Sequence, residues 1–152
     1  MLVRRLPPYS GNVGKRLVKS PKIYLRDSGL LHTLLQIDDG ESLLSHPKYG
    51  GSWEGFVIEN LLSVLPDGAG AYFYRTSAGA EIDLVVHFAA EPWAIEIKRT
   101  TAPKLSRGFH NACEDLQPSR KFVVYGGEER FRMPGEIDVM PLADLMAHLL
   151  PL

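Results

Sequence analysis

The sequence predicts a single α/β domain in which helices flank a central mixed sheet. The chain has 152 residues, of which 45% are hydrophobic, and a chain of this size can bury one core without disulfides or structural metals. Stretches with helical spacing of apolar residues also alternate with short β-type runs, in the order α, βββ, α, β, β, α. Such an order favours helices packed on a central sheet.

The first part of the chain carries little periodicity. Two consecutive prolines and several glycines interrupt residues 1–21, so we expect a basic, irregular N-terminal arm there, followed by one domain over residues 22–152. A short strand is predicted at Lys22–Arg26. A helix is predicted over Gly29–Ile37, capped by the Asp27-Ser28 pair, and a polar loop should connect it to the next helix.

The strongest helical signal begins at Ser52. Apolar residues recur there at helical spacing, and Pro66-Asp67-Gly68 ends the pattern. Three β-type runs follow with short breaks, which predicts an antiparallel meander over residues 71–75, 80–88 and 92–99. The remaining predicted elements are a helix over 104–117, strands at 121–125 and 137–140, and a short helix after Pro141.

The charges are distributed unevenly, although the net charge is only -1. Residues 1–26 contain seven Lys and Arg residues and no acid, so all 18 acidic residues lie in residues 27–152. A basic arm on an acidic body favours a polyanion such as DNA as a partner, or contact with another domain. A solvated arm without a partner is equally compatible with this pattern.

Several classes of function find no support in the sequence. Cys113 is the only cysteine, which favours a reducing, cytoplasmic compartment. No stretch approaches the roughly 20 apolar residues of a membrane helix, so no membrane association is expected. The segment Gly11–Arg16 has the wrong spacing for a phosphate-binding loop, so we expect no ATP site in this chain. The histidines lack the spacing of a zinc site.

Two neighbouring β-type runs carry acids and a lysine in an apolar setting. Alternation places Glu81 and Asp83 on one face of the first run, and Glu96 and Lys98 on one face of the second. If the two strands pair, Asp83, Glu96 and Lys98 can converge on one side of the sheet. A carboxylate beside an ammonium is costly in an apolar strand unless it is paired or bound to a metal.

Two carboxylates and a lysine at this spacing suit metal-assisted hydrolysis of phosphodiesters. Oxygen ligands hold Mg²⁺ or Mn²⁺, the ion activates water, and the lysine stabilises developing charge. A cross-strand salt bridge on a solvated sheet face is the alternative interpretation. Four basic residues flank the predicted site and are candidate contacts for nucleic-acid phosphates: Arg75, Arg99, Lys104 and Arg107.

Five ordered motifs resemble the domain of unknown function DUF4143, which usually forms the C-terminal part of bacterial and archaeal AAA-type ATPases. These motifs are residues 19–31, 51–59, 74–76, 79–83 and 94–98. Asp83 with Glu96-Ile-Lys98 also resembles the signature of PD-(D/E)XK nucleases, and the αβββαβ order from Ser52 to Tyr125 is similar to their restriction-endonuclease-like core. Ile82 stands where that signature has proline, and the chain has no counterpart of the ATPase half.

The resemblance implies a nuclease-like domain that acts on DNA phosphodiesters with Asp83, Glu96 and Lys98 as catalytic residues. In such nucleases the first core helix often supplies a further metal ligand. A helical wheel places Glu54 with the apolar face and Glu59 on the polar, solvent side, so Glu54 is the predicted third carboxylate. Equally, Glu54 can be an acid in the first turn of the helix that the helix dipole favours, and not a metal ligand. The alternative function is a non-catalytic DNA- or protein-interaction or regulatory module that docks to an ATPase domain or partner chain.

Overall fold

A computed structural model describes residues 1–11, 14–47, 49–88 and 90–150 of the chain. Its centre is a six-stranded mixed sheet with the strand order β3-β4-β5-β6-β8-β7. The strands are β3 (Gly70–Arg75), β4 (Glu81–Phe88), β5 (Glu91–Ile97), β6 (Arg120–Val124), β7 (Phe131–Met133) and β8 (Ile137–Met140). The helices of this part are α3 (Tyr49–Ser63), α4 (Arg107–Leu116) and α5 (Leu142–Leu149).

The sheet combines antiparallel and parallel pairs. Strands β3, β4 and β5 form the predicted antiparallel meander, whereas β5 pairs with β6, and β6 with β8, in parallel. The parallel step from β5 to β6 needs a crossover connection, which contains α4. Strand β7 was not predicted; its three residues are mostly exposed and pair antiparallel with β8.

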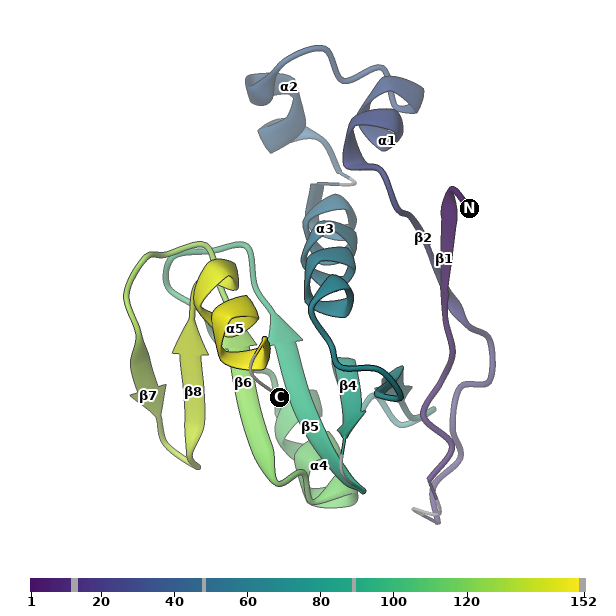
Figure 1. Cartoon of the computed structure of the whole chain (residues 1–152), viewed down its shortest axis with the longest axis vertical. Helices are drawn as coiled ribbons and strands as arrows, with labels where there is room; N and C mark the ends of the chain where they lie inside the picture. Colours follow the sequence, from purple (N-terminus) through teal and green to yellow (C-terminus); the bar gives the residue numbers. More distant parts are fainter. Residues whose placement is uncertain (12–13, 48, 89, 151–152) are drawn as a thin grey trace.

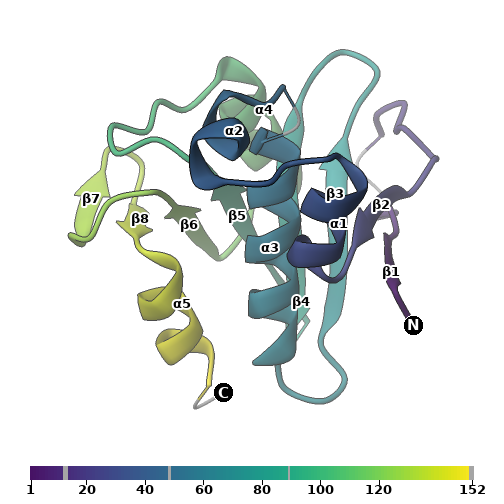
Figure 2. The same cartoon turned by 90° about the horizontal axis from the view of Figure 1, so that it is seen from above.

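Helices cover both faces of this sheet (Figures 1 and 2). Helices α3 and α5 contact each other, and their residues Ile58, Leu61 and Leu145 belong to one buried cluster. Helix α4 packs on β4 and β5, and its residues Phe109 and Ala112 belong to a second cluster. The two clusters lie on opposite sides of the strands, which confirms a mixed α/β domain with a central sheet flanked by helices.

The N-terminal arm is not wholly irregular, contrary to the sequence prediction. Strand β1 (Val3–Leu6) pairs antiparallel with β2 (Lys22–Leu25) in a separate two-stranded ribbon. Beyond the ribbon, the Tyr9 N–H donates to the Phe73 carbonyl of edge strand β3 at 2.7 Å. The arm therefore gains its order from long-range contacts with the domain, which local propensity does not reveal.

Two short helices, α1 (Ser28–Leu34) and α2 (Gly40–Ser45), lie beyond the N-terminal end of α3 (Figure 1). The Asp27 side chain caps α1 as predicted, accepting the N–H of Leu30 at 2.9 Å, but the helix ends before Ile37. Helix α2 occupies the segment expected to be a loop, and its first turn is stabilised by Asp39, which accepts the N–H of Ser42 at 2.7 Å. No helix among the described residues is long and apolar enough to cross a membrane.

Candidate functional site

A cleft of about 490 Å³ opens at the C-terminal end of β5. Its charged lining residues are Glu54, Glu81, Asp83, Glu96, Lys98 and Arg99. The structure therefore places the three predicted catalytic residues and the predicted additional acid Glu54 around one open space.

A β-bulge in β4 positions Asp83. Tyr72 pairs with Val85 and Tyr74 with Ile82, so two residues of β4, Asp83 and Leu84, stand opposite one residue of β3. The Asp83 side chain reaches β5, where its Oδ2 atom accepts the backbone N–H of Ile97 at 2.9 Å. Glu81 and Asp83 line the same cleft, as alternation predicts, whereas Ile82 and Leu84, predicted to share a face, belong to opposite buried clusters.

Glu96 is the most buried acid of the cleft, with 5% of its surface exposed. Its Oε1 atom accepts a hydrogen bond from the Lys98 ammonium at 2.8 Å. Its Oε2 atom is buried and has no hydrogen-bond partner within the described residues. A buried carboxylate oxygen without a partner is energetically unfavourable, so this atom calls for a cation or a water molecule.

The electrostatics of Asp83 and Glu96 match this picture. Burial, followed by the negative charges of Glu96 and Glu54, raises the pKa of Asp83 to about 8. Burial also raises the pKa of Glu96, although the hydrogen bond from Lys98 opposes this effect. Acids with raised pKa values in a cleft mark a candidate functional site. A divalent cation between them would favour their charged forms instead.

Lys22 is a residue of this site that sequence reasoning missed. Its Nζ atom lies 2.9 Å from Glu54 Oε1, 3.2 Å from Glu81 Oε1 and 3.8 Å from Asp83 Oδ1. Tyr24, two residues further along β2, donates its hydroxyl to the same Glu54 Oε1 atom at 2.5 Å. The Lys-x-Tyr spacing places both side chains on one face of a strand. This spacing was visible in the sequence, but it did not indicate which residues the two side chains would contact.

Helix α3 presents Glu54 to this ribbon because a glycine follows it. A Cβ atom at Gly55 would lie only 3.1 Å from the ring of Tyr24, so the glycine allows β2 to lie close against the helix. Glu54 therefore accepts hydrogen bonds from Lys22 and Tyr24 of β2, and it also lines the cleft.

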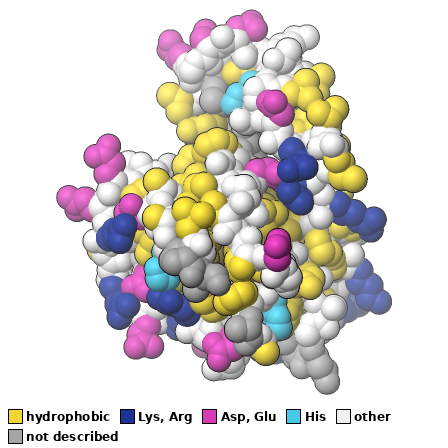
Figure 3. Space-filling view, in the orientation of Figure 1, with side chains coloured by type: hydrophobic (Ala, Val, Ile, Leu, Met, Phe, Trp, Pro, Cys, Tyr) yellow, Lys and Arg dark blue, Asp and Glu magenta, His cyan; other side chains and the backbone are white. Residues whose placement is uncertain are grey.

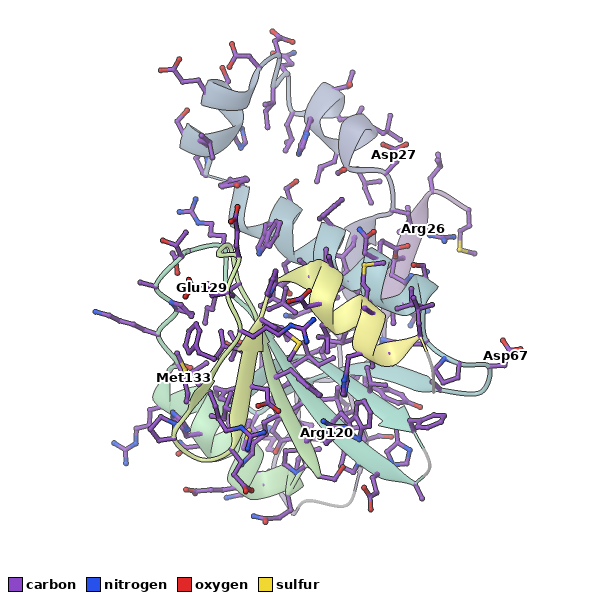
Figure 4. The ribbon with its side chains drawn as sticks, turned by 60° about the vertical axis from the view of Figure 1, so that its left-hand side comes forward. Arg26, Asp27, Asp67, Arg120, Glu129 and Met133 are labelled. Carbon is purple, nitrogen blue, oxygen red and sulfur yellow. The ribbon has the colours of Figure 1, made fainter. Side chains whose placement is uncertain are left out.

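Glu59 does not face solvent, which corrects the sequence prediction. Only 13% of its side chain is exposed, and its carboxylate pairs with Arg4 at 2.6 Å and with Arg26 at 2.9 Å. Arg26 lies between the end of β2 and the start of α1 (Figure 4). The ribbon covers the polar side of α3, a contact between distant segments that a helical wheel cannot show.

The four candidate phosphate contacts differ in their surroundings. Arg99 lines the cleft and lies over the ring of Tyr49 at 5.1 Å, whereas Arg75 is hydrogen-bonded to Glu81. Lys104 and Arg107 are exposed on either side of Ser106, which also lines the cleft. Further basic side chains gather along the side of the molecule that β1 and β2 form (Figure 3).

The residues around the cleft fit a divalent ion only in part. Within the described residues, no three His, Cys, Asp or Glu side chains are grouped to hold a metal ion. Asp83 and Glu96, with the unpartnered Oε2 atom of Glu96, offer two carboxylates. Mg²⁺ is commonly held by one or two carboxylates together with water and substrate phosphates. Glu54 as a third ligand stays a prediction.

Fold and site together define a mixed α/β domain with a charged cleft that an N-terminal ribbon helps to build. The chain belongs to the family described as "Domain of unknown function (DUF4143)", whose sequence model matches residues 49–145. A second model, "Domain of unknown function (DUF8612)", matches residues 1–41. The DUF4143 match confirms the resemblance for the four motifs within residues 51–98, whereas the first motif, residues 19–31, lies in the region that the DUF8612 model matches.

Curated relatives carry no assigned function. Uncharacterized proteins of Mycobacterium bovis and Mycobacterium tuberculosis are each 45% identical to this chain over 146 residues, which cover 96% of this chain and 33% of the relative. The chain therefore spans about one third of the length of these curated relatives. No solved structure matches the chain.

Proposed function

We propose that this protein is a metal-dependent nuclease domain of the PD-(D/E)XK type, which hydrolyses DNA phosphodiesters with Mg²⁺ or Mn²⁺ held by Asp83 and Glu96. The observation that carries the proposal is the cleft that Asp83, Glu96 and Lys98 line together, where one buried oxygen of Glu96 has no hydrogen-bond partner in the described part of the chain. The meander, crossover helix and parallel strand that frame the cleft support a restriction-endonuclease-like core.

Each residue has a role that follows from its contacts. The hydrogen bond from the Ile97 N–H fixes the orientation of the Asp83 carboxylate, and Glu96 of the neighbouring strand β5 lines the same cleft. A divalent ion held by Asp83 and Glu96 would supply the charge that polarises a phosphoryl oxygen and lowers the pKa of bound water. Burial opposes the charged form of Lys98, but the carboxylate of Glu96 outweighs this effect and raises the pKa of Lys98. Lys98 therefore stays an ammonium that stabilises negative charge developing on the phosphate.

The surroundings of the cleft suit a polyanionic substrate. Arg99 lines the cleft and is exposed, as are the neighbouring side chains of Lys104 and Arg107. Exposed cations at this position bind phosphates through charge and make binding sensitive to salt. These residues would place a DNA backbone across the carboxylates without reading its sequence.

Cleavage of supercoiled plasmid tests the proposal. Wild-type protein should nick or cut the plasmid with Mn²⁺ or Mg²⁺ and be inactive in EDTA. Lys98→Met should lose about 100-fold or more of the rate, which is typical when one charge-stabilising donor is removed. Lys121→Met, a change on β6 outside the cleft, is the matched control and should retain the wild-type rate. Absence of metal-dependent cleavage of single- and double-stranded DNA by the wild type would reject the proposal.

The second candidate is a non-catalytic interaction or regulatory module that binds DNA, an ATPase domain or a partner chain. One observation favours it: Lys22 and Lys98 already form ion pairs with Glu54 and Glu96 from within the chain. This candidate would be supported over the nuclease if the wild-type protein retards DNA in a gel without cutting it. The Asp83→Asn variant should then retard DNA equally.

A further inference from the structure

Three aromatic rings form a small pocket at the edge of the sheet, outside the acidic cleft. Tyr9 of the N-terminal arm, Tyr72 of β3 and His87 of β4 line it together with Ser10 and Gly11, and its volume is about 210 Å³. We infer that this pocket binds one unpaired base of a single-stranded DNA by stacking. The inference deepens the proposed function, on which it rests for the choice of DNA as the ligand.

The rings of the pocket have a defined arrangement. The centre of the Tyr9 ring lies 5.7 Å from that of Tyr72, edge to face, and 6.3 Å from that of His87, with the two planes inclined by 36°. Gly70 permits the position of the Tyr72 ring, because a Cβ atom there would lie only 2.6 Å from it. All three rings are only partly buried, so a flat ligand can reach them from solvent.

The polar atoms of these rings are available to a ligand. Within the described residues, the hydroxyls of Tyr9 and Tyr72 and the ring nitrogens of His87 make no hydrogen bond. A nucleobase combines a flat face, which stacks on aromatic rings, with donors and acceptors along its edges. The pocket is smaller than the roughly 300–1,000 Å³ of sites for drug-sized ligands, so it suits a single base.

The surrounding charge favours a base over an organic cation, the other ligand that aromatic rings attract. None of the described residues that line the pocket is acidic. The arm that supplies Tyr9 belongs to residues 1–26, which contain seven Lys and Arg residues and no acid. This charge repels a cation and attracts the phosphates of a nucleic acid. Bases in a duplex stack on each other, so only an unpaired base offers a free face.

The basic arm continues from the pocket toward the cleft along the edge of the sheet. Tyr9 pairs with the middle of β3 through the Phe73 carbonyl. Beyond the end of this strand, the Ser77 N–H donates to the carbonyl of Arg16 at 2.9 Å, two positions before Gly79 of the cleft. Arg16 is exposed. A strand with a base at Tyr9 would therefore meet a positive charge on its way to the cleft.

The pocket and the cleft are close enough for one DNA strand to reach both. His87 and Asp83 lie four positions apart on β4, which corresponds to about 13 Å at roughly 3.3 Å per residue. Stacked nucleotides of one strand are spaced by about 3.4 Å, so about four of them span this distance. A base in the pocket would thus position a phosphodiester bond a few nucleotides away at the cleft.

Binding of a labelled single strand in EDTA tests the inference with the whole chain and without cleavage. Fluorescence anisotropy compares a short oligo(dT) with an abasic strand of equal length, which keeps the phosphates but lacks the bases. The wild type should bind oligo(dT) at least about fivefold more tightly, the lower limit for stacking of one base on an aromatic side chain. Tyr9→Leu should remove most of this preference, whereas Tyr9→Phe, which keeps the ring, should retain it.

Further variants separate stacking from charge and from misfolding. His87→Leu should reduce the preference as Tyr9→Leu does, so the test does not depend on the folding of one variant. Arg16→Met should weaken binding of both strands alike, because it removes a contact to phosphate. Phe131→Leu is the matched control and should keep the preference, since Phe131 is a 41% exposed aromatic residue of β7, at the opposite edge of the sheet.

The outcomes separate the inference from the proposed function. A wild type that prefers oligo(dT), with the preference lost in Tyr9→Leu, but that cleaves no DNA with Mg²⁺ or Mn²⁺ would uphold the pocket and reject the nuclease. Metal-dependent cleavage together with equal affinity for the two strands would overturn the inference and leave the nuclease intact. A preference that is unchanged in both Tyr9→Leu and His87→Leu would also overturn the inference.

Discussion

The body of the molecule, residues 49–150, and its N-terminal region, residues 1–47, are held in place by different forces. Among the described residues, every buried hydrophobic side chain except Leu6 belongs to the body. Helix α1 of the N-terminal region has no buried residue at all. Backbone hydrogen bonds join Tyr9 and Val18 of this region to β3, and charged side chains join it to α3, with Arg4 and Arg26 on Glu59 and Lys22 on Glu54. The candidate site forms where the two regions meet. The presence of Lys22 in it therefore depends on the attachment of the N-terminal region to the body.

The largest expected difference between the regions is in core substitutions. Leu61 of α3 is fully buried, whereas Leu34 of α1 is 64% exposed. Leu61→Ala should lower the free energy of unfolding by about 2–5 kcal/mol because it leaves a cavity. Leu34→Ala should change it by less than about 0.5 kcal/mol. Urea denaturation measures both values, and similar losses in the two variants would refute the contrast.

The attachment of the ribbon should depend on Glu59. Glu59→Gln removes the partner of Arg4 and Arg26 and should weaken the ribbon by on the order of 1 kcal/mol, a modest value because both arginines are partly exposed to solvent. Hydrogen exchange should then accelerate in β1 and β2 but not in β5. The exposed Glu114→Gln on α4 is the control. Equal protection of β1 in the wild type and in Glu59→Gln would show that charge does not hold the ribbon.

The same attachment should weaken in acid. Partial burial disfavours the charge of Glu59, but the hydrogen bonds from Arg4 and Arg26 outweigh it and lower the pKa of Glu59 below its ordinary value of 4.5. Since the folded pKa is depressed, this stabilisation is complete above about pH 4.5 and is lost as the pH falls through the lowered value. Hydrogen exchange of β1 at a series of acidic pH values measures this loss. If the Glu59→Gln variant loses protection of β1 over the same pH range, the loss must be due to another titratable group.

The smallest expected effect concerns Cys113 of α4. Burial raises the pKa of its thiol to about 11, so little thiolate exists at neutral pH and the cysteine should react slowly with disulfide reagents. Modification should be slower than that of the same protein unfolded in urea. Rapid labelling of the native protein at pH 7 would contradict the packing of α4 against the sheet.

Much of the body could be predicted from the sequence because its signals are local. The spacing of apolar residues located α3, and the β4–β5 hairpin placed Glu96 and Lys98 in a cleft beside Asp83. The missing features depend on contacts between distant segments. Lys22 and Glu54 are separated by 32 positions, and Arg4 and Glu59 by 55. Strand β1 and the partial burial of Glu59 arise from these contacts, so neither periodicity nor a helical wheel could reveal them.

The bulge at Asp83 was unpredictable for another reason. Alternation assumes a regular strand, and β4 carries one extra residue relative to β3 at this point. The prediction brought Asp83 near Glu96 but did not foresee the hydrogen bond to the Ile97 N–H that turns its carboxylate toward β5.

Mn²⁺ binding to the wild type and to Glu96→Gln tests the central claim most directly. If Asp83 and Glu96 hold a divalent ion, electron paramagnetic resonance should detect one bound ion per wild-type chain, with affinity lowered by at least about tenfold in Glu96→Gln through loss of a charged ligand. The exposed Glu114→Gln should bind as the wild type does. No Mn²⁺ binding by the wild type, or equal binding by Glu96→Gln, would contradict the account.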